Sequence, residues 1–298
     1  MSLPPRAYVD RPITDSVAAD RAAGTAAKLW GLAAPEPVRM GMNAIFASGS
    51  VVLRVSAPNA PAEVSLDLAR FWDDHGVTVP RAARDDVVVV DGLSVTAWER
   101  IDDVGAPVDW VGVGELVRRV HETDPRHVPA SVPVPSPTAF PWWDFDSLLE
   151  RAAPVLDEPA RGGLVDAIER HRDWREFDGS VLCHGDVHPG NVLMRADGPV
   201  LLDWDLLCVA PPGWDHGPML TLAERWGRRP GEYEEFAQGY GRSLRDDPMT
   251  VALAELRLVA ATLMRVAASI ADPGARPEAE RRLRYWRGEP DAPPWTAQ

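Results

Sequence analysis

The pattern of hydrophobic and polar positions predicts a small β-rich unit in the first hundred residues. The stretch "AIFASGSVVLRV" (residues 44–55) has two apolar runs joined by a Ser-Gly turn, which predicts a β-hairpin. The stretch "DVVVVDGLSV" (residues 86–95) repeats this pattern around an Asp-Gly pair, which favours a two-residue turn. Between the hairpins, residues 61–76 carry apolar side chains at helical spacing, and residues 14–32 predict an earlier helix.

Beyond residue 100 the pattern becomes mainly helical. Helices are predicted over residues 110–124 and 249–272, and others over much of 144–174 and 218–244. A proline-rich connector at residues 129–143 excludes a central strand or helix there. Short apolar runs between residues 181 and 202 predict a few strands within this helical part. We therefore expect an α+β protein with a small N-terminal lobe, residues 1–97, and a larger C-terminal lobe, residues 98–298.

Length and composition narrow the class of protein. A chain of 298 residues is long enough for two domains or two lobes. We expect a cytoplasmic protein without a membrane span, because no apolar run approaches about 20 residues and the N-terminus lacks the apolar core of a signal peptide. Cys183 and Cys208 lie in or beside apolar runs, so they are expected to be buried thiols. The net charge of −14 disfavours nucleic acid as a partner.

The polar stretch "VLCHGDVHPGN" (residues 181–191) is the strongest candidate for chemistry. An apolar run enters it, a Pro-Gly turn interrupts it, and an apolar hairpin that ends at Asp203 follows. This arrangement is expected to bring Asp186, Asn191 and Asp203 together. Phosphoryl transfer needs such a set, with a carboxylate base and hard oxygen ligands for Mg²⁺. The spacing of His184, Asp186 and Asn191 also matches the catalytic loop of protein kinases.

A metal-dependent hydrolase is the remote alternative interpretation of the same stretch. In a strand, His184, Asp186 and His188 would share one face and could bind zinc. The neighbouring glycines and proline favour a loop, however, and the other five histidines form no spaced cluster. A purely structural role, in which these polar residues cap a turn, is a further alternative for the two histidines.

"HGDVHPGN" followed by "VLLDWD" resembles the signature of the aminoglycoside phosphotransferase / choline kinase-like family. "NAIFASGSVVLRV", "LVRRVHETD" and "APPGWDHG" are similar to further segments of that family. The resemblance implies the bilobal protein-kinase-like fold and transfer of the γ-phosphoryl group of ATP or GTP to a hydroxyl group. It also implies roles for residues of the motif: Asp186 as catalytic base, His188 as support for the loop, and Asn191 and Asp203 as Mg²⁺ ligands. Asp205 and Asp215 are expected to be structural.

The nucleotide side departs from the family pattern. Arg54 stands where the resemblance implies a phosphate-binding lysine, and Glu63 or Asp67 is its expected partner. The nucleotide base is expected against the backbone of Trp98, Glu99 and Arg100. No glycine-rich loop is evident, and Gly41 and the turn at residues 48–50 are weaker substitutes. These departures leave open a nucleotide-binding protein with weak catalysis or none.

The acceptor is expected to be a small hydroxylated molecule. Its binding wall is predicted from residues 137–174 and from the helices after Asp215, which carry Trp142, Trp143, Asp144, Glu224, Trp226, Glu232, Glu234 and Glu235. Acidic side chains near a pocket suit a cationic acceptor, and solvated helix faces explain the same acids equally well. We expect a monomer or a homodimer.

Overall fold

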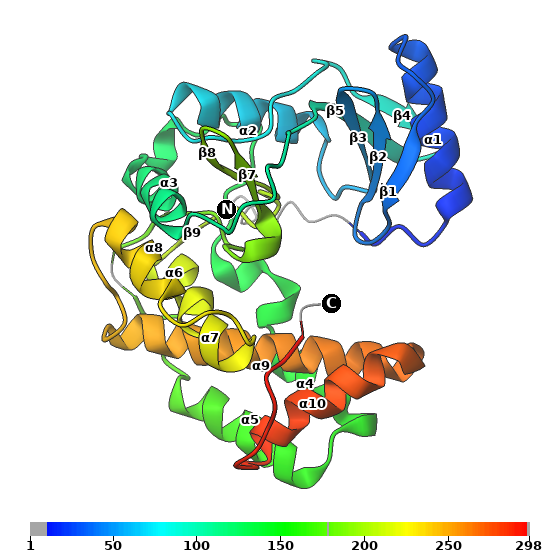
Figure 1. Ribbon diagram of the computed structural model, residues 1–298. Coiled ribbons are helices and arrows are strands. Elements are labelled where there is room, and N and C mark those ends of the chain that lie inside the picture. Colours follow the sequence, from blue (N-terminus) through cyan, green and yellow to red (C-terminus); the bar gives the residue numbers. More distant parts are fainter. Residues whose placement is uncertain (1–10, 178, 297–298) are drawn as a thin grey trace, which may run out of the picture.

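A computed structural model describes residues 11–177 and 179–296 (Figure 1). Most of the N-terminal segment used for the signal-peptide expectation lies outside the described residues. The small lobe contains a five-stranded sheet with the order β1-β2-β3-β5-β4, and its neighbouring strands are all antiparallel. The strands are β1 (Glu36–Arg39), β2 (Ala44–Ser48), β3 (Val51–Ser56), β4 (Val88–Val90) and β5 (Leu93–Glu99). Both predicted hairpins are present, and β1 is an additional strand that the sequence pattern did not predict.

One face of this sheet packs against helix α1 (Ser16–Leu29), as Figure 1 shows. Buried and half-buried residues alternate along β2 and β3, because successive side chains of a strand point to opposite faces. Phe46 and Leu53 belong to the face that packs against five buried alanines of α1. Arg54 therefore lies on the opposite face of the sheet, away from α1.

Backbone geometry confirms the turn predicted between β4 and β5. Asp91 and Gly92 have φ angles of 50° and 82°, and a two-residue turn between right-handed twisted strands requires positive φ at both positions. The predicted first helix is also present, but it begins later than expected. Its N-cap is Asp15, whose side chain accepts a hydrogen bond from the Ala18 N–H, and Thr14 lies outside it.

Helix α2 (Glu63–Asp74) connects the small sheet to the rest of the molecule. The apolar residues that predicted it are all buried. Val64, Leu68, Phe71 and Trp72 pack in the same cluster as residues of the large lobe, whereas the sheet and α1 form a separate cluster. Figure 1 shows α2 beside α3, at a distance from α1. The predicted lobe boundary at residue 97 stays a prediction, and β5 continues two residues beyond it.

The large lobe is mainly helical, which confirms the α+β class. Its α-helices are α3 (Trp110–Glu122), α4 (Phe145–Ala152), α5 (Glu158–Arg170), α6 (Gly213–Leu220), α7 (Leu222–Arg225), α8 (Glu232–Tyr240), α9 (Pro248–Ala271) and α10 (Arg276–Trp286). Helix α6 begins five residues before the predicted start at Pro218, and α10 was not predicted. The connector at residues 129–143 contains only short 3₁₀ turns, as its prolines indicate.

Two small antiparallel sheets lie within this helical lobe. Strand β6 (Val181–Cys183) pairs with β9 (Cys208–Ala210), and β7 (Val192–Arg195) pairs with β8 (Gly198–Leu201). Cys183 and Cys208 are fully buried free thiols, as expected. Among the described residues, no helix is both long enough and apolar enough to cross a bilayer.

Candidate active site

The polar stretch forms a loop between β6 and β7, and a buried carboxylate fixes the start of this loop. Asp215, near the start of α6, accepts hydrogen bonds from the backbone N–H groups of His184 (2.8 Å) and Gly185 (2.7 Å). His121, at the end of α3, lies 3.1 Å from the same carboxylate. Burial alone would raise the pKa of Asp215, but the His121 hydrogen bond and the nearby positive charge keep this pKa below its usual value. Asp215 is therefore a structural anchor, and it anchors the loop itself.

Gly185 and His184 explain why the loop turns where it does. Gly185 has a φ of 89°, and a Cβ there would lie 2.2 Å from the Leu206 carbonyl oxygen, so only glycine fits. His184 is fully buried. Its Nδ1 accepts from the Asp186 N–H at 3.2 Å, and its Nε2 donates to the Leu202 carbonyl at 2.9 Å. The imidazole thus ties the loop to the end of β8.

Asp186 is the best-placed base in the loop. Its Oδ2 accepts from the Asn191 side-chain amide at 3.1 Å and lies 3.4 Å from Nε2 of His188. Its Oδ1 accepts from the guanidinium of Arg257, on α9. Burial would raise the pKa of Asp186, but the positive charge of Arg257 and the contact with His188 outweigh it and lower this pKa. Asp186 is therefore ionised at neutral pH and able to accept a proton.

Asn191 and Asp203 have a chemistry that fits a magnesium ion. The Asn191 amide nitrogen donates to the backbone carbonyl and the carboxylate of Asp186, at 3.0 and 3.1 Å, and among the described residues Oδ1 has no hydrogen-bond partner. Asn191 directly precedes β7 and Asp203 follows β8, and the Leu202 N–H bonds to the Asn191 carbonyl at 2.9 Å. Asp203 is exposed and has a φ of 60°. An amide oxygen and a carboxylate are the hard ligands that Mg²⁺ prefers.

The zinc interpretation does not fit this geometry. Both ring nitrogens of His184 are bonded to the backbone, and Nδ1 of His188 accepts from the Gly190 N–H at 3.0 Å. Within the described part of the chain, the one group of metal-ligating side chains close enough to share an ion is His121, Cys183 and Asp215. All three residues are buried, the Asp215 carboxylate accepts from two backbone N–H groups, and both ring nitrogens of His121 have hydrogen-bond partners, so this group has the contacts of a structural cluster.

Arg54 has a different carboxylate partner from the one expected. Its guanidinium lies 2.7 Å from Asp205, which follows β8 in the large lobe, and the side chains are only 16% and 12% exposed. Asp67 instead bonds to Arg70 and Ser131, and within residues 11–177 and 179–296 no ion pair joins Arg54 to Glu63. Asp205 therefore makes an ion pair that connects the two lobes, beyond the structural role expected for it.

The position of α2 explains this change of partner. Trp72 of α2 packs against Trp204 with ring centroids 4.9 Å apart, and Trp204 packs against His184 at 4.5 Å, both ring pairs in a tilted arrangement. These contacts, together with the apolar cluster of the large lobe, hold α2 beside the catalytic loop. Glu63, in the first turn of α2, is exposed to solvent.

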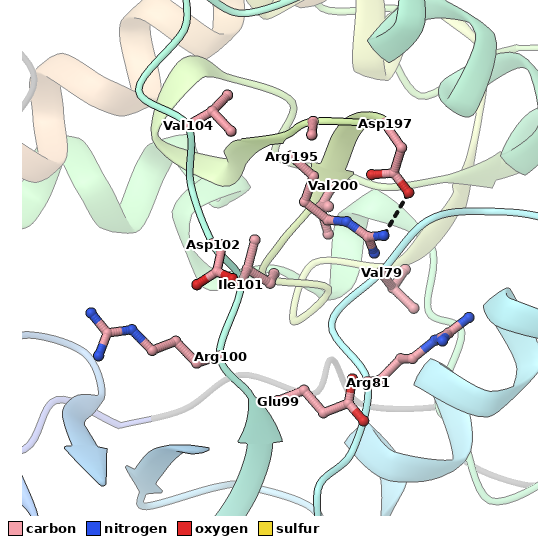
Figure 2. Close-up of a pocket in the computed structure, with 11 residues that line it drawn as sticks. Val79, Arg81, Glu99, Arg100, Ile101, Asp102, Val104, Arg195, Asp197 and Val200 are labelled. Atoms are coloured by element: carbon pink, nitrogen blue, oxygen red, sulfur yellow. Dashed lines mark hydrogen bonds and ion pairs between the residues drawn. The ribbon is translucent and has the colours of Figure 1, made fainter. Parts of the chain in front are cut away.

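The segment predicted to hold the nucleotide base borders a cavity of about 570 Å³ (Figure 2). Glu99, Arg100, Ile101 and Asp102 line one wall, and the turn between β7 and β8 lines another. In Figure 2 the Arg100 side chain extends away from Arg81, whereas Glu99 extends toward it. None of the residues lining the cavity belongs to the catalytic loop, so the cavity lies beside the candidate site and is not the site itself.

Two backbone N–H groups of this segment are already bonded within the protein. The Glu99 N–H bonds to the Arg81 carbonyl at 2.8 Å, and the Arg100 N–H bonds to the Ser50 carbonyl at 2.9 Å. The turn at residues 48–50 therefore adjoins this segment, and the loop containing Gly41 is the one between β1 and β2. Trp98 donates from Nε1 to Thr96 at 2.8 Å. Among the described residues, the N–H groups of Ile101 and Asp102 have no hydrogen-bond partner.

A protein-family comparison matches residues 46–259 to the model of the phosphotransferase enzyme family. This match covers more than half of the chain and includes the catalytic loop, β3 and the first half of α9. The chain belongs to the phosphotransferase enzyme family.

Solved structures with the same fold include three kinases of small molecules. Amicoumacin kinase hAmiN is 12% identical, with a TM-score of 0.69 and coverage of 95% of this chain and 98% of that chain. A choline/ethanolamine kinase family protein from Mesorhizobium loti is 18% identical, with a TM-score of 0.66 and coverage of 92% and 94%. Aminoglycoside phosphotransferase APH(3'')-Id from Streptomyces rimosus is 21% identical, with a TM-score of 0.61 and coverage of 82% and 98%. These likenesses confirm the protein-kinase-like fold.

Two residues of this phosphotransferase site were missed by reasoning from the residues alone. Arg257 lies 71 positions after Asp186, in an apolar helix, and nothing in its local pattern indicates a contact with the loop. His121 was counted among the unclustered histidines, although the similarity of "LVRRVHETD" to the family was a signal that could have marked it.

Most acids predicted to line a cationic-acceptor wall have local partners. Asp144 caps α4, Glu232 pairs with Arg228, Glu234 with Arg245, and Glu235 with Arg229. Trp143 is 2% exposed and packs between Trp174 and Trp214, which makes it part of the core. The surface-face interpretation of these acids therefore describes the structure better than the pocket interpretation.

Proposed function

We propose that this phosphotransferase transfers the γ-phosphoryl group of ATP or GTP to the hydroxyl of a small molecule, with Asp186 as the base. The observation that supports this most strongly is the ionised Asp186, held by Asn191 on one oxygen and facing an opening with 24% of its side chain exposed. In this position the carboxylate orients an acceptor hydroxyl and takes its proton as the oxygen attacks phosphorus.

The other residues of the site have supporting roles in the proposal. Asn191 Oδ1 and the Asp203 carboxylate hold Mg²⁺, which, when bound, neutralises the charge of the nucleotide phosphates. His188 braces Asp186 through Nε2, because its Nδ1 accepts from the Gly190 N–H. Arg54 binds a phosphate after exchanging its contact with Asp205, and the free N–H groups of Ile101 and Asp102 are the donors available for the nucleotide base.

The test is Mg²⁺-dependent consumption of ATP and of GTP with a panel of hydroxylated amines, sugars and hydroxy acids. The expected result is nucleotide consumption that depends on one acceptor class, with a phosphorylated acceptor detected by mass spectrometry. Asp186→Asn is expected to lower turnover by about 10²–10⁴-fold, the usual contribution of a general base, without loss of the fold. Asp166→Asn, at an exposed acid of α5, is the matched control.

A nucleotide-binding protein without catalysis is the second candidate, and the Arg54–Asp205 ion pair favours it. This pair holds the proposed phosphate-binding group on a carboxylate of the protein. Two results together would support this candidate and refute the kinase. The first is nucleotide binding in a thermal-shift assay that Asp186→Asn leaves unchanged. The second is the absence of nucleotide consumption with every acceptor of the panel.

A further inference from the structure

Arg257 is a cationic side chain that contacts the proposed base, Asp186, from helix α9. It projects from the third turn of α9, between Leu256 and Leu258, which are 0% and 4% exposed. Arg257 itself is 23% exposed, and its partner Asp186 is 24% exposed. The pair therefore lies at an opening and not inside the core, although α9 is otherwise largely buried.

The guanidinium of Arg257 has N–H donors that the contact with Asp186 does not use. One terminal nitrogen bonds to Oδ1 of Asp186, and this is its one ion pair with the described residues. A guanidinium carries five N–H donors in a planar fork, which suits two oxygens of a carboxylate or a phosphate. In the described part of the chain, Nε and the other terminal nitrogen have no hydrogen-bond partner. An anionic group beside Asp186 would satisfy these donors.

On α9, the face that carries Arg257 is the one that meets the catalytic loop, and the nearest charged residue of the helix lies on the other side. Glu255, two positions earlier, is paired on the other side of the helix with Arg170 and with His171 of the α5 C-terminus. Its charge is thus neutralised away from the catalytic loop. Four of the five acids predicted for the acceptor wall, Asp144, Glu232, Glu234 and Glu235, are likewise paired with arginines or cap a helix. The charge that directly adjoins the base is positive.

We propose that the acceptor carries a carboxylate close to the hydroxyl that is phosphorylated, and that Arg257 binds this carboxylate while Asp186 receives the hydroxyl. The inference rests on the proposed kinase function and specifies its acceptor as a small hydroxy acid. A purely cationic acceptor would place its charge against Arg257, and like charges in a partly desolvated site repel each other. The hydroxyl proton passes to Asp186, the acceptor oxygen bonds to the γ-phosphorus, and the nucleoside diphosphate leaves.

The experiment compares acceptors that differ only in the anionic group. The pairs are glycerate and glycerol, homoserine and homoserinol, and gluconate and sorbitol, with choline and ethanolamine as cationic members. Binding is measured first, by thermal shift or calorimetry without nucleotide, and turnover second. At least one hydroxy acid is expected to bind and to be phosphorylated, with kcat/KM at least about tenfold above that of its neutral analogue, as for a charge-assisted hydrogen bond.

The variant Arg257→Gln is expected to reduce this preference to near unity by raising KM for the hydroxy acid. Arg257→Lys keeps the charge and is expected to restore part of the preference, which a merely structural role would not produce. Arg118→Gln is the matched control, because Arg118 also contacts a carboxylate but lies on the surface of α3. Circular dichroism of each variant verifies the fold.

The outcomes separate the two proposals. Equal or better use of the neutral or cationic members, an unchanged preference in Arg257→Gln, or failure of every hydroxy acid to bind overturns the inference even if the protein is an active kinase. Carboxylate binding that Arg257→Gln abolishes, without nucleotide consumption by the native protein, supports the inference about the site and refutes the proposed reaction.

Discussion

The catalytic loop and the small-lobe sheet differ in how their polar residues are held. In the loop, Asp186 is joined to Asn191 and His188, which are five and two positions away, and to His184 through its backbone. In the sheet, Arg54 bonds to Asp205, 151 positions away, and the expected local partners of Arg54 do not take part. The contacts within the loop follow from a short segment, to which α9 adds Arg257, whereas the contact of Arg54 depends on how the lobes meet.

The two sets of contacts are expected to respond differently to substitution. Spacing within a loop is a covalent constraint, so the roles of the loop residues are fixed together. An ion pair between lobes is a tertiary contact, and a shift of one helix is enough to replace it.

Loss of the Asp215 carboxylate is expected to cause the largest change in stability. Asp215 is 0% exposed and accepts from two backbone N–H groups and from His121. Asp215→Asn replaces one acceptor oxygen by a donor and leaves buried donors unpaired, which is expected to cost about 3 kcal/mol. Urea denaturation measures this loss. The exposed Asp166 provides the control, because its replacement by Asn is expected to change stability by no more than about 0.5 kcal/mol. Equal stabilities of the two variants would show that the loop does not depend on its anchor.

Asp203 tests whether the end of the hairpin holds the metal. Asp203→Asn removes a charged oxygen ligand, so turnover is expected to fall about 10²-fold or more and the Mg²⁺ requirement to rise. The measurement is a Mg²⁺ titration of turnover at saturating nucleotide. An unchanged half-saturating Mg²⁺ concentration would assign the metal to other residues, with Asp205 as the next carboxylate to replace.

The elements and the loop could be predicted because their signals are local. Asp91-Gly92 specified its turn, the apolar residues of α2 specified its buried face, and the spacing from His184 to Asn191 specified the loop. Arg257 had no such signal, because it lies in a mainly apolar helix and only tertiary packing brings it to Asp186. Asp205 could not be predicted as the partner of Arg54 in place of Glu63 for the same reason, because this pairing depends on α2 packing against Trp204.

Substitutions of Arg54 and Glu63 distinguish the predicted pairing of Arg54 with Glu63 from the observed pairing with Asp205. Arg54→Gln is expected to raise KM for the nucleotide about tenfold, because one charge-assisted phosphate contact is lost. Asp205→Asn is expected to lower this KM, since Arg54 no longer has to exchange a carboxylate for a phosphate. Glu63→Gln is expected to change it less than about twofold. If Glu63→Gln instead matched Arg54→Gln, the expected pairing of these two residues would form when nucleotide binds.

The smallest predicted effect is a pH dependence of stability that arises at the buried His216 of α6. Burial, together with repulsion from His121, lowers the pKa of His216 from 6.5 to about 3. The ring lies between aromatic residues of α8, and its Nδ1 is 3.2 Å from the Tyr233 hydroxyl. Because the folded pKa is the lower one, the unfolded chain takes up a proton below pH 6.5 that the folded chain does not. Stability is therefore complete above pH 6.5 and declines as the pH falls toward 3.

Between pH 7.5 and 5.5 the loss from this one histidine is expected to be about 1 kcal/mol. His184, whose pKa is also lowered by burial, adds to the loss in the same direction. His216→Phe keeps a ring among Phe236 and Tyr240 and removes the titrating group, so the urea midpoint should vary less with pH in this variant than in the native protein. Since the buried apolar residues of α8 and of the small-lobe sheet belong to separate clusters, replacing Arg54 should leave the pH dependence unchanged. An equal pH slope in His216→Phe and the native protein would place the titrating group elsewhere, with His184 in the loop as the first to examine.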